Sequence, residues 1–86
     1  MVREAVLMES KQVKRQVEQI SGVSNLNYDV IALLCNKLEG IAALEEYKLD
    51  AREAGNQESQ ALFERLQQRA TEDVNELKQF LSKSLS

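Results

Sequence analysis

Glu45 is the carboxylate whose position points most directly to chemistry. In a helix turning about 100° per residue it falls within about 40° of Leu34 and Leu38, inside an apolar arc. A carboxylate in apolar surroundings needs a partner or a proton. Glu45 is therefore either a metal ligand or buried acid, or half of an interhelical or intersubunit salt bridge at the rim of a seam. Arg52 lies on the same helix face as Glu45 and could form a salt bridge with a carboxylate from another helix.

Asp73 is the second carboxylate in an unusual place. It interrupts an apolar stripe between Leu66 and Phe80, one helical turn after Arg69. A pair between Arg69 and Asp73, four residues apart, would satisfy it locally. Alternatively, Asp73 and Glu76 could join Glu45 in a carboxylate cluster able to hold a hard cation.

The chain contains no histidine, which removes the largest group of catalytic possibilities. Ser-His and Cys-His nucleophilic catalysis and histidine zinc sites are excluded. The three glycines are isolated at positions 22, 40 and 55, so there is no glycine-rich phosphate loop. We expect no enzyme activity and no cofactor.

Cys35 and Tyr47 have plainer interpretations. Cys35 lies at the edge of the apolar arc, without a neighbouring base or helix N-terminus that would activate the thiol. It is expected to be a small buried apolar residue rather than a redox thiol. Tyr47 lies among small residues and is expected to pack its ring with the hydroxyl at the rim.

Composition fits one small helical domain. The 86 residues include no proline, 43% are hydrophobic and the net charge is −3. This mild acidity argues against nucleic acid as a partner. No signal peptide and no run of about 18 apolar residues is visible, so we expect a cytoplasmic protein without a membrane span.

Apolar spacing and turn residues predict three helices. An amphipathic N-terminal helix covers 2–20, a connector covers 21–27, and a helical hairpin covers 28–54 and 57–84. Asn27 is the expected N-cap of the middle helix, with Leu26 and Ile31 as a hydrophobic staple. Gly55 is expected to close the middle helix in the left-handed conformation, and Asn56 to cap the last one.

The two long helices differ in the width of their apolar surface. The last helix has one stripe about 140° wide, whereas the middle helix spreads its apolar residues over about 220°. The wider arc predicts a second copy that completes a four-helix bundle, or, in a three-helix monomer, coverage by the N-terminal helix. The residues expected to form the oligomeric seam are Val30, Leu34, Leu38, Ile41, Phe63, Leu66, Val74, Leu77 and Leu81.

About fifty residues resemble one half of a ferritin-like or rubrerythrin-like bundle. The resemblance rests on Leu38–Tyr47, the Ala54-Gly55 turn, Ala61–Glu64 and Ala70–Leu81. It implies a hairpin that dimerises into a four-helix bundle. In this family one glutamate and a Glu-x-x-His motif from each helix pair hold a di-iron site.

The metal motif of that family is incomplete in this chain. The resemblance places Glu39 at the first glutamate, Glu72 at the second and Asn75 at the histidine. Asparagine does not replace imidazole as an iron ligand, and Glu72 and Asn75 project onto the polar side of their helix. The resemblance supports the architecture and argues against inherited activity.

The leading hypothesis is a non-catalytic helical interaction or structural module that acts through self-association as a homodimer. One alternative is a ferritin-like carboxylate metal protein, with Glu39, Glu45, Asp73 and Glu76 as candidate ligands. Another is an adapter that docks the helix of a protein partner in its exposed groove.

Overall fold

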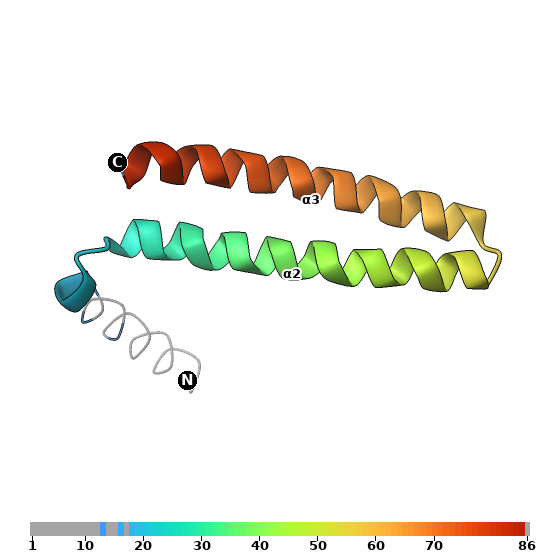
Figure 1. Cartoon of the computed structure of the whole chain (residues 1–86), viewed down its shortest axis with the longest axis horizontal. Coiled ribbons are helices and arrows are strands. Elements are labelled where there is room, and N and C mark those ends of the chain that lie inside the picture. Colours follow the sequence, from blue (N-terminus) through green and yellow to red (C-terminus); the bar gives the residue numbers. More distant parts are fainter. Residues whose placement is uncertain (1–12, 14–15, 17, 86) are drawn as a thin grey trace, which may run out of the picture.

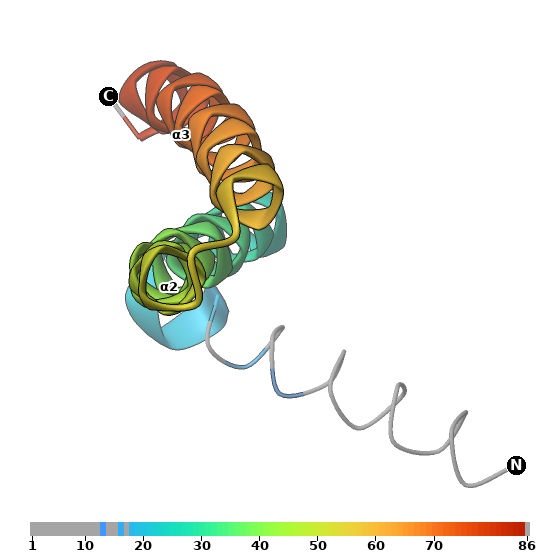
Figure 2. The same ribbon diagram turned by 90° about the vertical axis from the view of Figure 1, so that its right-hand side faces the viewer.

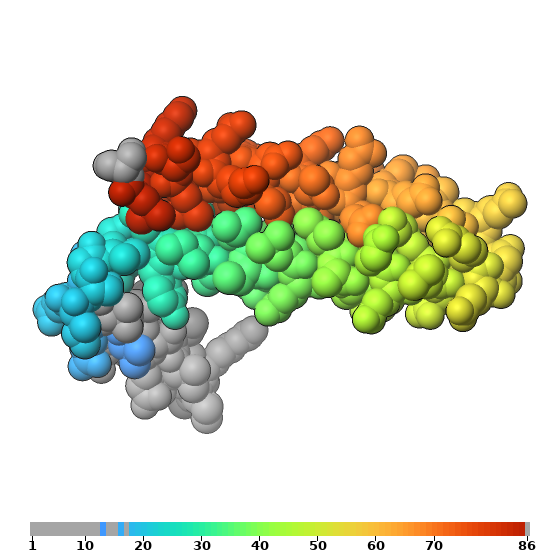
Figure 3. Space-filling view, in the orientation of Figure 1, coloured from blue at the N-terminus to red at the C-terminus, as the bar shows by residue number. Residues whose placement is uncertain are grey.

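The computed structural model describes residues 13, 16 and 18–85. Two long helices, α2 (Asn25–Glu53) and α3 (Gln57–Ser84), run antiparallel and lie side by side along their length (Figures 1 and 3). The predicted all-α helical hairpin is confirmed.

The N-terminal helix predicted over 2–20 is described only in part. Val13, Gln16 and residues 18–21 are helical, and the other positions lie outside the described residues. Ile20 is 88% exposed. The Glu18 carboxylate accepts a hydrogen bond from the backbone N–H of Asn25 at 3.1 Å, which ties this segment to the first turn of α2.

Helix α2 begins earlier than the sequence predicted. Its N-cap is Ser24, whose hydroxyl accepts from the backbone N–H of Asn27 at 3.1 Å, so the predicted Asn27 cap and the start at residue 28 are wrong. The connector shortens from 21–27 to 22–24. Serine and asparagine are comparable N-caps. Asn27 is instead the third residue of α2, and it is buried. Leu26 is 73% exposed, so the predicted staple does not form.

The turn between the helices follows the prediction. Gly55 has φ +67°, and its N–H donates to the carbonyl of Arg52 at 3.0 Å. The N–H of Asn56 donates to the carbonyl of Ala51 at 2.9 Å, and the two bonds together form a Schellman motif. The Asn56 side chain then caps α3 by accepting from the N–H of Ser59 at 3.0 Å.

The helices meet along a seam with alternating steps of three and four residues. On α2 the seam positions are Asn27, Val30, Leu34, Lys37, Ile41, Leu44, Lys48 and Ala51, all buried or half-buried. On α3 they are Gln60, Phe63, Gln67, Ala70, Val74, Leu77 and Leu81, again buried or half-buried. This period is that of an antiparallel coiled coil, and Figure 2 shows the shallow crossing of the two helices.

The core of the hairpin is thin. Among the apolar residues that the structure describes, only Ala51 and Val74 are buried, at 5% and 9% exposure. Lysine, glutamine and asparagine occupy several seam positions. The seam therefore sets how the helices pair, while much of the apolar surface stays outside it.

Candidate interaction surface

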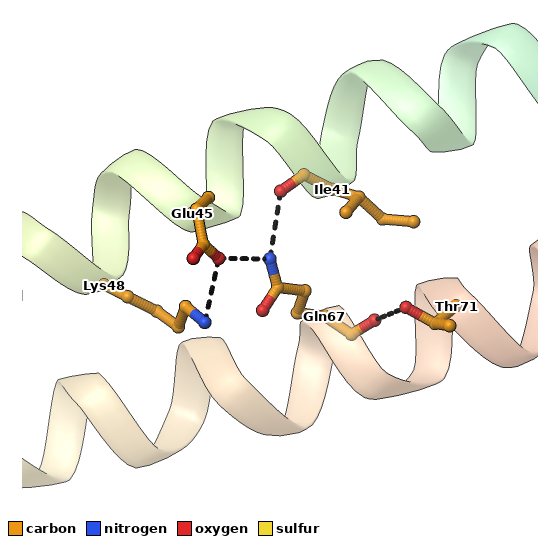
Figure 4. A network of polar contacts seen from close by, with 5 residues as sticks. All are labelled: Ile41, Glu45, Lys48, Gln67 and Thr71. Atoms are coloured by element: carbon orange, nitrogen blue, oxygen red, sulfur yellow. Dashed lines mark hydrogen bonds and ion pairs between the residues drawn. The ribbon is translucent and has the colours of Figure 1, made fainter.

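A polar network joins the two helices in the half of the hairpin nearer the turn (Figure 4). The side-chain amide of Gln67 donates to the carbonyl oxygen of Ile41 at 3.2 Å and to Oε2 of Glu45 at 2.8 Å. Lys48 Nζ lies 2.9 Å from the same carboxylate oxygen, and Thr71 donates to the carbonyl of Gln67 at 2.9 Å. Gln67 thus contacts two groups of α2 at one level of the seam, and Glu45 extends the network to Lys48.

This network defines the chemistry of Glu45. Hydrogen bonds from Lys48 and then from Gln67 hold the pKa of Glu45 below its ordinary value, and desolvation acts in the opposite direction. Its side chain is 62% exposed, so the carboxylate lies at the rim of the seam rather than inside an apolar arc. An ionised, paired and exposed carboxylate has a structural role here.

Two further polar contacts cross the seam away from the turn. Lys37 Nζ lies 3.1 Å from the Asp73 carboxylate, which replaces the predicted local pair with Arg69. Near the open end, the Ser84 hydroxyl donates to the side-chain oxygen of Asn27. Both contacts join positions at matching distances from the turn, so they favour one register of the hairpin.

The carboxylates named as candidate metal ligands in the alternative hypothesis are not gathered together. Glu45 belongs to the network with Gln67, Asp73 pairs with Lys37, and Glu39 is exposed on α2. Among the residues the structure describes, no group of three or more cysteines, aspartates or glutamates could hold a metal ion. The predicted cluster of Asp73, Glu76 and Glu45 is therefore wrong, because the contacts across the seam draw Asp73 and Glu45 to different partners.

One flank of the seam carries a shallow groove of about 470 Å³. Leu33 and Phe80 supply its apolar walls, and Lys37, Asp73 and Glu76 its polar groups. The large apolar residues exposed on the two helices include Leu26, Leu33, Tyr47, Leu62, Leu66 and Phe80. The Tyr47 ring packs against Phe63 with its centroid 5.8 Å away, as expected for a ring at the rim.

A second stripe, apolar except for Glu45 and Arg52, lies elsewhere on α2. We call it the outer stripe, and it consists of Tyr28, Ile31, Cys35, Leu38, Ala42, Glu45, Leu49 and Arg52. Each member follows a seam residue by one position, so the stripe is turned about 100° from the seam. All its members are exposed, with Ile31 at 37%, Leu38 at 49% and Leu49 at 50%.

Cys35 belongs to this outer stripe, so its predicted burial within the chain is wrong. Leu34 takes the seam position, and the next residue is turned away from α3. The apolar arc of α2 was wide enough to include both positions, but α3 covers only one of them.

The residues expected to form an oligomeric seam divide in the same way. Val74 is buried, and Val30, Leu34, Ile41, Phe63, Leu77 and Leu81 are half-buried in the seam between α2 and α3. Leu38 and Leu66 are exposed, at 49% and 37%. Most of the expected set is therefore used within one chain, and the exposed apolar surface includes residues outside that set.

The comparisons with known proteins add no assignment. The chain matches no model of a protein family, no curated protein and no solved structure. Within the part of the chain that the structure describes, neither long helix is apolar enough to cross a membrane. The contacts and surfaces of the hairpin therefore carry the functional argument.

Proposed function

We propose that this chain is a non-catalytic interaction module that acts by associating with itself through its helical hairpin. The observation that carries the proposal is the outer stripe. Its apolar side chains run along α2 beside a seam that α3 already fills, and they are exposed in the single chain.

Burial of the outer stripe against another chain is energetically favourable. Burial of apolar surface contributes roughly 25 cal/mol per Å², and helical hairpins of this size rarely bury enough within one chain to be stable alone. Among the apolar residues that the structure describes, only Ala51 and Val74 are buried. A second copy would bury the exposed stripe and complete a four-helix bundle.

The polar groups support a structural rather than a catalytic role. Glu45 is bound by Lys48 and Gln67, and Asp73 by Lys37. These contacts use the carboxylates to position the helices. A catalytic acid or base would need a pKa near the working pH, whereas that of Glu45 is shifted downward, away from neutrality.

The proposal is tested by measuring the mass in solution before and after a charge is placed in the outer stripe. We expect gel filtration with light scattering to give about twice 9.8 kDa for the natural chain at micromolar concentrations. Leu38→Glu should give a monomer that keeps its helical circular dichroism, because Leu38 lies outside the seam.

Gln79→Glu is the matched control, since it adds the same charge at an exposed position on the outward side of α3, away from the outer stripe. It should leave the mass unchanged. A natural chain that stays monomeric at tens of micromolar would refute self-association.

A further inference from the structure

The outer stripe has the spacing of a second coiled-coil seam. From Tyr28 to Arg52 its members alternate steps of three and four residues, over about 36 Å of helix. Helix α2 therefore carries two seams of the same period, and α3 occupies one of them. The vacant seam is suited to another long helix with the same repeat.

The outer stripe is complementary to its own reverse. When two copies of α2 run antiparallel and are aligned at Gly40, Ile31 lies opposite Leu49 and Leu38 opposite Ala42. Cys35 then lies opposite Glu45, and Tyr28 opposite Arg52. This alignment uses every position of the stripe, pairs the large Leu38 with the small Ala42 and places Ile31 against Leu49, with each pair repeated across the axis as an isologous twofold interface requires.

Charge distinguishes the two possible directions. In a parallel pair in register, Glu45 would face Glu45 and Arg52 would face Arg52 within the contact. In the antiparallel pair, Arg52 lies over the Tyr28 ring, where a guanidinium is favourable. Glu45 lies beside Cys35 while its charge stays compensated by Lys48 of its own chain, 2.9 Å away.

The flank of α3 explains why the contact belongs to α2. The residues that follow the seam positions of α3 by one lie on the same side of the hairpin as the outer stripe. They include Glu64, Gln68, Thr71 and Lys78, all exposed and polar. A second copy on this side would therefore make its apolar contacts with α2, and the two α3 helices would lie outside the contact.

We propose that a second copy of this chain packs antiparallel along the outer stripe, α2 against α2, with the twofold axis at the level of Gly40. The inference rests on the proposed self-association. It adds the surface that makes the contact, the relative direction of the two α2 helices and their register.

Cross-linking at Cys35 tests this geometry. The variant Glu45→Cys places a second thiol opposite the natural Cys35 of the other copy, and a bis-maleimide shorter than about 15 Å should link two chains. Within one chain, residues 35 and 45 are about 15 Å apart along the helix, as are the two Cys35 thiols of the antiparallel pair. The natural chain should therefore not cross-link.

Two further variants keep the test decisive. Asp50→Cys places the thiol at an exposed position at least about 100° from Glu45, Leu49 and Arg52 of the outer stripe and should not cross-link. Cys35→Ser combined with Ile31→Cys and Leu49→Cys leaves the Glu45 network intact and should cross-link as Glu45→Cys does. Circular dichroism confirms that each variant is helical.

The outcomes separate this inference from the proposed function. Covalent dimers of Glu45→Cys and of the triple variant, with none from the natural chain or Asp50→Cys, support the antiparallel interface. If light scattering shows a dimer but the natural chain cross-links through Cys35, or neither paired variant does, the geometry is wrong while self-association stands. A monomeric natural chain overturns both.

Discussion

At the scale of single residues, the polar members of the seam fix how the hairpin pairs. Gln67, Lys37 and Asn27 each contact a polar group on the opposite helix. A purely apolar seam with a seven-residue repeat would tolerate a shift of one heptad, whereas these contacts are satisfied in one register. They fix which face of α2 packs against α3, and therefore which face of α2 remains exposed.

The Glu45 contact predicts a specific titration. Because hydrogen bonding to Lys48 lowers the pKa of Glu45, its contribution to stability is complete above the ordinary pKa of an unfolded glutamate. It is lost as the pH falls through the lowered folded value. We expect NMR of the side-chain carboxyl to give Glu45 a lower midpoint than a reference glutamate peptide.

Lys48→Met should move the Glu45 midpoint upward toward the ordinary value, since it removes the largest cause of the shift. Lys78→Met, which removes a charge from an exposed position of α3, is the control and should leave the midpoint in place. An unchanged midpoint in Lys48→Met would show that the contact does not persist in solution.

The buried Val74 gives a measure of the seam itself. Val74→Ala removes two methyl groups at 9% exposure and should lower the free energy of unfolding by about 1–3 kcal/mol. Asn75→Ala, at the exposed neighbouring position, should change it by less than about 0.5 kcal/mol. Urea unfolding at one fixed protein concentration makes the comparison, and equal effects would contradict the seam assignment.

At the scale of helices, two glycines make opposite predictions. A Cβ built on Gly55 or Gly40 meets no atom within 4 Å, so space does not distinguish them. Gly55 has φ +67°, and Gly55→Ala should destabilise the hairpin by about 1 kcal/mol. Gly40 lies inside α2, and Gly40→Ala should stabilise it by about 0.5–1 kcal/mol. Thermal unfolding measures both, and changes of the same sign would contradict the turn geometry.

The sequence determined much of the helical layout. Isolated glycine, asparagine and the absence of proline located the turn at Gly55 and the cap at Asn56, because these residues act locally. The start of α2 was missed since Ser24 and Asn27 are comparable caps, and the choice depends on contacts at Asn25 and Ser84 that are distant in sequence.

The surface was harder to predict for a different reason. A wide apolar arc showed that α2 needs more than one neighbour, but two seams of equal period lie within it. Only the packed structure shows that Leu34 packs against α3 while Leu38 is exposed. The same ambiguity led to the wrong expectation for Cys35.

At the scale of the whole molecule, the antiparallel dimer brings one like-charge pair close together. Glu39 is exposed beside the outer stripe, and the twofold axis would place it about 3 Å along the axis from its counterpart. Glu39→Gln should therefore tighten the dimer by about 1.5- to 5-fold, the range for an exposed pair worth about 0.2–1 kcal/mol. Glu72→Gln, on the outward side of α3, is the control in sedimentation equilibrium, and equal effects of the two would argue against the axis.

Native mass spectrometry of protein purified without chelator is the decisive measurement for self-association, because it records chain number and bound metal together. We expect a species of twice 9.8 kDa without stoichiometric metal. A species of 9.8 kDa alone, at concentrations of tens of micromolar, would contradict it.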